Sequence, residues 1–109
     1  MRYPIWNELC TETIGAYSLD NLPGCSQVCV SHDLFFESEH RGKGNGKRRH
    51  TDRLDAIKEL GYDYALCTVD LKNAAQIRIL TEAGWQCLAG FISSKTGNHV
   101  RIYGRRIEQ

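Results

Sequence analysis

A glycine-rich basic segment near the middle of the chain has residue types and spacing suited to binding a charged ligand. Arg41-Gly42-Lys43-Gly44-Asn45-Gly46 interleaves glycines with polar and basic residues, and Lys47 follows directly. Glycines allow the backbone to turn sharply and bring its N–H groups close to a ligand. A helix that starts at the end of the segment would add unsatisfied N–H donors and the positive end of its dipole. The segment therefore predicts a cradle for a phosphate or pyrophosphate group.

Two common phosphate-binding motifs do not fit this segment. The P-loop pattern GxxxxGK[ST] is absent, and Gly42, Gly44 and Gly46 give GxGxG instead of the dinucleotide fingerprint GxGxxG. Nucleic-acid binding is a further alternative, because Lys and Arg gather between residues 40 and 53, where we also place His50 in a solvated basic patch. The net charge of the chain is only +1, which makes nucleic acid the least favoured partner.

The elements on either side of this segment follow from the apolar pattern. Val28 to Phe36 alternates as a strand, with His32 and Leu34 on the same face. A helix is expected from Asn45 to Leu60, with Gly61 as its terminator. A second helix over 73–83 would have Asn73 as its N-cap, and Gly84 would end it. The glycine-rich segment would then lie between a strand and the start of a helix.

The remaining elements complete a single-domain α/β fold over residues 1–109. Tyr64 to Val69 is an apolar run that predicts a strand buried on both faces. The start of the chain, Ile5 to Ile14, predicts a short helix, because Trp6, Leu9, Cys10 and Ile14 lie near helical spacing. Two final strands over 85–92 and 100–107 should form an antiparallel pair. The order predicts a mixed, mostly antiparallel sheet with a central parallel strand pair and flanking helices.

Two separated motifs resemble those of the GCN5-related N-acetyltransferase family. Arg41, Gly44 and Gly46 match the acetyl-CoA motif [RQ]-x-x-G-x-[GA], and the strand end Leu34-Phe35-Phe36 precedes it at the expected distance. The later family segment N-x-x-A-x-x-[LF]-Y-x-x-x-G-[FW] is matched at four positions. These are Asn73, Ile79, Gly84 and Trp85. The resemblance covers about three quarters of the chain and implies the acyl-CoA N-acyltransferase fold in a member with a reduced N-terminal part.

The resemblance implies that acetyl-CoA is bound as a cosubstrate. Its pyrophosphate would lie on residues 41–47, and its pantetheine arm would fill a gap where the strand ending at 36 splays from the strand starting at 64. Asn73 would lie near the pantetheine or the thioester. The residues assigned to the cosubstrate on this basis are Leu34, Phe35, Phe36, Arg41, Gly42, Lys43, Gly44, Asn45, Gly46, Lys47 and Asn73.

Acetyl transfer to an amine needs a base for the ammonium and an acid for the leaving thiolate. His32 is the candidate base, with Asp33 and Glu37 as weaker alternatives, although a strand-surface histidine without a role explains His32 as well. The tyrosine that serves as acid in many family members is replaced by Leu80. Tyr103 is a distant candidate for the acid.

Three readings of function remain open from the sequence. The first is an N-acetyltransferase that acts by direct attack of a primary amine, on a small molecule or a protein lysine. The second is an acyl-CoA-binding regulatory module without catalysis, which the leucine at the tyrosine position favours. The third is the nucleic-acid-binding protein considered above. A homodimer could complete the acceptor side, where only 27 residues precede Val28.

Composition and cysteine content add expectations about location and metals. The sequence starts without an apolar signal-peptide core and has no run long enough to cross a bilayer, so we expect a cytoplasmic protein. The five cysteines should be free and mostly buried. Cys25, Cys29 and His32 lack a fourth ligand at suitable spacing, so no metal is expected.

Overall fold

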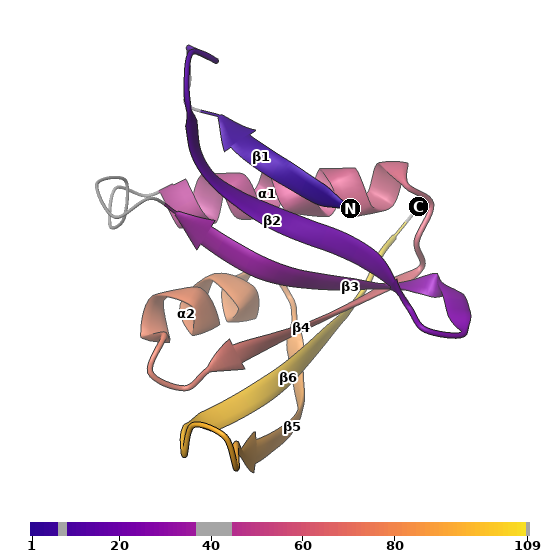
Figure 1. Ribbon diagram of the computed structural model, residues 1–109. Helices are drawn as coiled ribbons and strands as arrows, with labels where there is room; N and C mark the ends of the chain where they lie inside the picture. Colours follow the sequence, from indigo (N-terminus) through magenta and orange to yellow (C-terminus); the bar gives the residue numbers. More distant parts are fainter. Residues whose placement is uncertain (7–8, 37–44, 109) are drawn as a thin grey trace.

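The computed structural model describes residues 1–6, 9–36 and 45–108, with the backbone alone at 33, 35, 36 and 45–49. Its strands make one sheet in the order β1-β2-β3-β4-β6-β5 (Figure 1). β3 and β4 are parallel, and all other neighbours are antiparallel, which confirms the predicted fold class. The elements are β1 (Arg2–Trp6), β2 (Thr13–Leu22), β3 (Cys25–Phe36), α1 (Asn45–Glu59), β4 (Tyr64–Asp70), α2 (Ala74–Glu82), β5 (Gln86–Ile92) and β6 (His99–Arg106).

The start of the chain forms strands, so the helix predicted from Ile5 to Ile14 is wrong. β1 pairs with β2, the rings of Tyr3 and Tyr17 stack at 5.5 Å between centroids, and Ile5 and Ile14 are buried. The helical pattern had relied in part on Leu9, which is 81% exposed. A short helix without an apolar face against the core is marginal, whereas pairing with a long strand satisfies the backbone of both.

A bulge in β3 corrects the predicted arrangement of its two faces. Ser18 pairs with His32 and Ala16 with Phe35, so β3 has one more residue than β2 across this step. Cys29 and Ser31 are buried on the helix side and His32 is exposed, but Leu34 packs against the core. His32 and Leu34 therefore lie on opposite faces, because an extra residue in a strand reverses the alternation beyond it.

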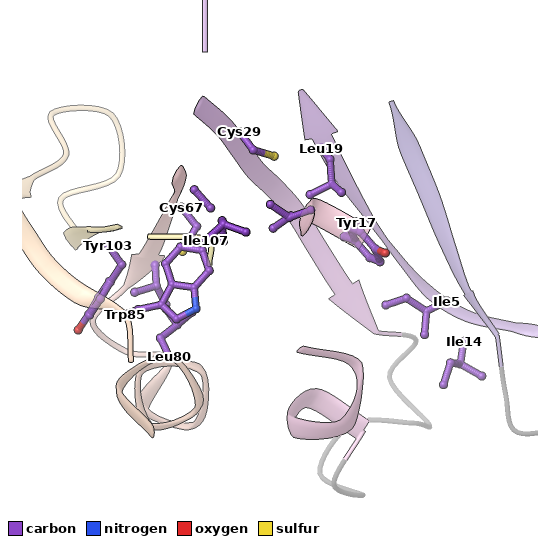
Figure 2. Packing of buried hydrophobic residues seen from close by; sticks show 13 residues of the cluster. Ile5, Ile14, Tyr17, Leu19, Cys29, Cys67, Leu80, Trp85, Tyr103 and Ile107 are labelled. Carbon is purple, nitrogen blue, oxygen red and sulfur yellow. The ribbon is translucent and has the colours of Figure 1, made fainter. Parts of the chain in front are cut away.

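Both helices cover the same face of the sheet. Ile57 of α1 and Leu80 of α2 belong to one buried cluster with the alternate β4 residues Ala65, Cys67 and Val69 (Figure 2). The intervening β4 residues are partly or fully exposed, so the prediction of a strand buried on both faces is wrong. The apolar composition of β4 could not reveal that no helix of the described residues lies on its second face.

Helix termini follow the predicted local signals. The Asn73 side chain accepts a hydrogen bond from the Gln76 N–H at 3.2 Å, which confirms it as the N-cap of α2. Gly84 after α2 and Gly61 after α1 have φ of 87° and 84°, the left-handed conformation that favours glycine at a helix end. Gly97 (φ 73°) lies in the turn between the antiparallel strands β5 and β6, as expected.

Three buried polar side chains link α1 to Trp85, the residue before β5. They place His50 in the core, whereas the sequence predicted it in a solvated basic patch. His50, Arg53 and Trp85 are each at most 4% exposed. The Trp85 indole N–H donates to His50 Nε2 at 3.0 Å, and Arg53 Nη2 lies 2.7 Å from His50 Nδ1. Both neighbours are donors, so protonated His50 would have no acceptor among them. Burial lowers the pKa of His50 to about 3, and the cations of Arg53 and Arg105 act in the same direction.

The burial of His50 predicts that stability falls in mild acid. The pKa of His50 drops from 6.5 to about 3 on folding, so the unfolded chain binds the extra proton and is favoured below pH 6.5. Between pH 7 and pH 5 this single group should remove about 2 kcal/mol of unfolding free energy. Over the same interval, the unfolding free energy of His50→Gln should fall by about 2 kcal/mol less than that of the wild type. Urea unfolding at the two pH values measures the difference. His99→Gln, which changes an exposed histidine, serves as the control and should behave like the wild type.

Candidate functional site

The parallel pair β3–β4 separates after a short ladder. Only Val28–Tyr64, Cys29–Ala65 and Val30–Leu66 are paired, although β3 continues to Phe36 and β4 to Asp70. Figure 1 shows the two arrows diverging toward their tips. The splay that the family resemblance implied is therefore present. Beyond the ladder, the facing edges of β3 and β4 pair with no other strand of the described chain.

The separation follows from what each strand pairs with on its other side. β3 stays with β2 as far as the pair Gly15–Phe36, and its bulge lies just beyond the last contact with β4. β4 stays with β6 along its whole length, as far as Asp70–Val100. A bulge bends the strand that contains it, so β3 follows β2 away from β4. The resulting gap is bordered by two strand edges, which are suited to hydrogen bonding with an extended ligand.

The N-termini of both helices lie at the open end of this gap. α1 begins at Asn45 after β3, and α2 begins at Ala74 after β4, so each helix starts beyond the C-terminal end of one parallel strand. This edge of a parallel sheet is where helix N-termini collect and anions bind. The first turn of α1 contains no acidic residue, and its sequence includes Lys47 and Arg48. Cations at this end oppose the helix dipole, and a bound anion would relieve that repulsion.

The structure describes some of the predicted cosubstrate residues and not others. Arg41, Gly42, Lys43 and Gly44 lie outside the described residues, as does Glu37. Asn45, Gly46 and Lys47 form the start of α1, and Phe35 and Phe36 pair with β2 through their backbone. Asn73 caps α2 at the open end of the gap, whereas the Leu34 side chain packs into the core. The predicted cosubstrate residues that the structure describes therefore lie around the open end of the gap. The side chain of Leu34 is the exception, because it packs against the core.

His32 lies beside the start of the gap and is held by a residue that the sequence did not indicate. Its Nε2 is 2.7 Å from Asp20 Oδ2 on the neighbouring strand β2. Asp20 also accepts a hydrogen bond from the amino group of Met1, and these bonds from Met1 and His32 lower the pKa of the Asp20 carboxyl. Asp20 therefore stays ionised and orients the imidazole, the arrangement that assists a histidine base. Asp20 begins the run Asp20-Asn21-Leu22-Pro23-Gly24, whose composition is typical of a turn, so its residue type did not mark it as a partner of His32.

The two positions considered for a general acid lie in the core. Leu80 is fully buried, and Tyr103 is 3% exposed with its hydroxyl accepting a hydrogen bond from Arg101 Nη1 at 3.3 Å. Tyr103 is paired with Cys67, whose side chain is on the helix side of the sheet, whereas His32 is on the opposite face. The fold therefore does not bring Tyr103 and His32 together.

The cysteines are free, as predicted, but only two are buried. Burial raises the pKa of the Cys29 and Cys67 thiols to about 11, so neither is a ready thiolate at neutral pH. Cys10 and Cys87 are exposed, which contradicts the expectation of mostly buried thiols. Within the described ranges, no three His, Cys, Asp or Glu side chains gather as metal ligands. No helix in these ranges is long and apolar enough to cross a membrane.

Comparison with known proteins identifies the fold through solved structures alone. No protein-family model matches the chain, and no curated protein sequence does so. A Salmonella typhimurium protein solved with its cofactor acetyl-CoA is similar at a TM-score of 0.78 and 18% identity over 92% of this chain. The chain spans 61% of that protein's length.

Two further structures carry the same fold at greater coverage. The ribosomal-protein-S18-alanine N-acetyltransferase from Escherichia coli matches at a TM-score of 0.81 and 11% identity, over 100% of this chain and 70% of its own. An acetyltransferase of the GNAT family from Bacillus anthracis matches at a TM-score of 0.81 and 14% identity, over 99% of this chain and 67% of its own. Together with the parallel pair that splays after three residue pairs, these similarities show that the chain has the GCN5-related N-acetyltransferase fold.

Proposed function

We propose that the chain binds acetyl-CoA in the gap between β3 and β4 and transfers its acetyl group to a primary amine. The observation that carries the proposal is the β3–β4 ladder that ends at Val30–Leu66, with two helix N-termini at the open end. The similarity to a Salmonella structure that contains acetyl-CoA supports the same choice of ligand. Acetyl-CoA, when bound, supplies the activated acetyl thioester.

The residues around the gap fit the parts of this ligand. The start of α1, with backbone N–H groups and no acidic residue, suits the pyrophosphate. The unpaired edges of β3 and β4 offer backbone donors and acceptors to the amides of a pantetheine arm. Asn73 uses its side-chain oxygen to cap α2, so it orders the end of the gap through the helix that it starts. Binding of this kind depends on backbone geometry more than on particular side chains.

His32 and Asp20 are the groups proposed to prepare the amine. The imidazole of His32 would remove a proton from the incoming ammonium, and the Asp20 carboxylate would hold the ring and stabilise the charge that it gains. His32 is 41% exposed, which leaves an acceptor access to it. Neither the similar Escherichia coli structure nor the similar Bacillus anthracis structure decides which acceptor this chain uses. A small amine and a protein amino group, such as the alanine named for the Escherichia coli enzyme, both fit the proposal.

A binding module without catalysis is the second candidate, and one observation favours it. Leu80 occupies the position of the expected tyrosine, is fully buried and has no proton to give. Tyr103 is turned to the helix side of the sheet. An enzyme built this way would rely on water to protonate the leaving thiolate. Release of coenzyme A in the presence of amines separates the two candidates.

Charge reversals at the two ends of α1 test the cosubstrate site. Lys47→Glu should weaken acetyl-CoA binding at least tenfold, or about 1.4 kcal/mol, because it sets a negative charge where the pyrophosphate would lie. Lys58→Glu makes the same change in the last turn of the same helix and should alter the affinity less than twofold. Isothermal titration of the wild type and both variants measures this. Undetectable binding by the wild type, or equal losses in the two variants, contradicts the proposed site.

Substitutions of the proposed base and of its partner test their role in catalysis. His32→Ala should lower kcat by about 10²-fold or more, the usual contribution of a general base, with the affinity for acetyl-CoA nearly unchanged. Asp20→Asn should produce a smaller loss in kcat, because it keeps a hydrogen-bond partner but removes the negative charge. Thiol release with a panel of amines and lysine peptides gives the rates, and His99→Ala is the matched control. A full rate in His32→Ala would remove His32 from the mechanism.

A further inference from the structure

The edge strand β5 is unusually open for a strand rich in apolar residues. All seven of its residues, Gln86 to Ile92, are exposed, and none of them is charged or proline. Leu88, Phe91 and Ile92 are 51%, 47% and 71% exposed. An exposed apolar edge strand is a template for pairing with another strand, and proteins commonly protect such edges with charge or proline. β5 has neither form of protection.

The opposite edge of the same sheet shows the contrast. β1 is the strand at that edge, and its five residues include Arg2 and Pro4. Proline cannot donate a backbone hydrogen bond, and a charged side chain opposes burial against a second sheet. One edge of the sheet is thus closed to further pairing by its sequence, and the other is open. β5 is therefore the edge at which pairing with another strand is expected.

The hydrogen-bonding pattern shows which groups β5 offers at its free edge. Ser93 N–H donates to Asn98 O across the β5–β6 turn, and His99 O accepts from Leu71 N–H on the other side of β6. Since antiparallel pairs alternate between bonded and non-bonded, Ile92 opposite His99 directs its N–H and C=O away from β6. The same alternation directs the backbone groups of Gly90, opposite Arg101, to the free edge.

The regular part of this edge has a natural centre. A bulge at Leu88 separates the Cys87 and Ala89 pairings, so regular geometry runs from Ala89 to Ser93. Phe91 is its middle residue. A two-fold axis at Phe91 would place an identical strand from a second copy beside β5. Gly90 of each copy would then form backbone hydrogen bonds with Ile92 of the other. Each Ile92 would then lie beside a glycine, and the two Phe91 rings would meet across a non-bonded pair.

We infer that β5 is the contact between two copies of this chain, paired antiparallel about Phe91 into one continuous sheet. A second copy is the occupant that fits, because the segment is self-complementary in backbone pattern and in side-chain size. It also carries no charge that self-pairing would bring against a like charge. β5 is separated from the β3–β4 gap by β6 and β4, so this contact is independent of the proposed function.

Sedimentation equilibrium and engineered cross-linking test this contact. The wild type should dimerise within a series of protein concentrations that reaches on the order of 100 µM, as expected for an interface below standard size. Ile92→Lys places a charge on the free edge and should shift the midpoint of association at least tenfold to higher concentration. Leu60→Lys changes another exposed leucine, 51% exposed at the end of α1, and should leave association unchanged. Both positions are exposed, so neither variant should alter the circular dichroism spectrum.

Cross-linking then identifies the strand and its register. Phe91→Cys, in a chain with the exposed Cys10 and Cys87 replaced by serine, should form a disulfide dimer on mild oxidation, because a non-bonded pair brings its Cα atoms to about 4.5 Å. Leu60→Cys in the same background should stay uncross-linked. A wild type that is monomeric throughout the series overturns the inference. So does a dimer that tolerates Ile92→Lys or that fails to cross-link through position 91.

Discussion

The three-residue parallel ladder between β3 and β4 is the constraint on which the rest of this structure depends. Its paired residues, Val28–Val30 and Tyr64–Leu66, join one half of the sheet, β1-β2-β3, to the other, β4-β6-β5. A ladder that continued toward Phe36 would close the gap. The bulge beyond His32 ends the ladder by bending β3 toward β2. Sheet continuity and ligand access are thus set by the same few residues.

Packing beneath the sheet compensates for this weak connection. Ile57 and Leu80 bring α1 and α2 into a cluster that includes Cys29 of β3 and the buried residues of β4, so both sides of the gap are anchored to the same helices. Trp85 and His50 add a hydrogen bond between α1 and the entry to β5. The helices therefore hold the two halves at a fixed separation. A gap bordered by rigid elements binds a ligand without the entropic cost of ordering its walls.

The site combines a conventional binding geometry with an unusual set of candidate catalytic groups. Backbone edges and helix N-termini, which any sequence of this fold supplies, account for the proposed cosubstrate contacts. The side chains are more particular, because Asp20 and His32 form a cross-strand pair on one face while Leu80 and Tyr103 are buried on the other. The fold thus supports acetyl-CoA binding more strongly than it supports a specific acid–base pathway.

The sequence by itself determined the features that depend on neighbouring residues. The strand before the glycine-rich segment, both later helices, the Asn73 cap and the glycine ends at 61 and 84 were all predictable, because capping and alternation are local. The order of these elements was enough to predict a central parallel pair in a mixed sheet. The two family motifs added the splay of that pair.

Only the tertiary structure decided the features that depend on distant partners. The segment from 5 to 14 became strands because β1 found β2, and His32 parted from Leu34 because pairing with β2 forced a bulge. Asp20 joined His32 through that same pairing, across 12 residues of sequence. His50 was buried because the Trp85 indole, 35 residues later, faces it under the sheet. Each outcome rests on a contact between residues far apart in the chain, and local spacing carries no information about such contacts.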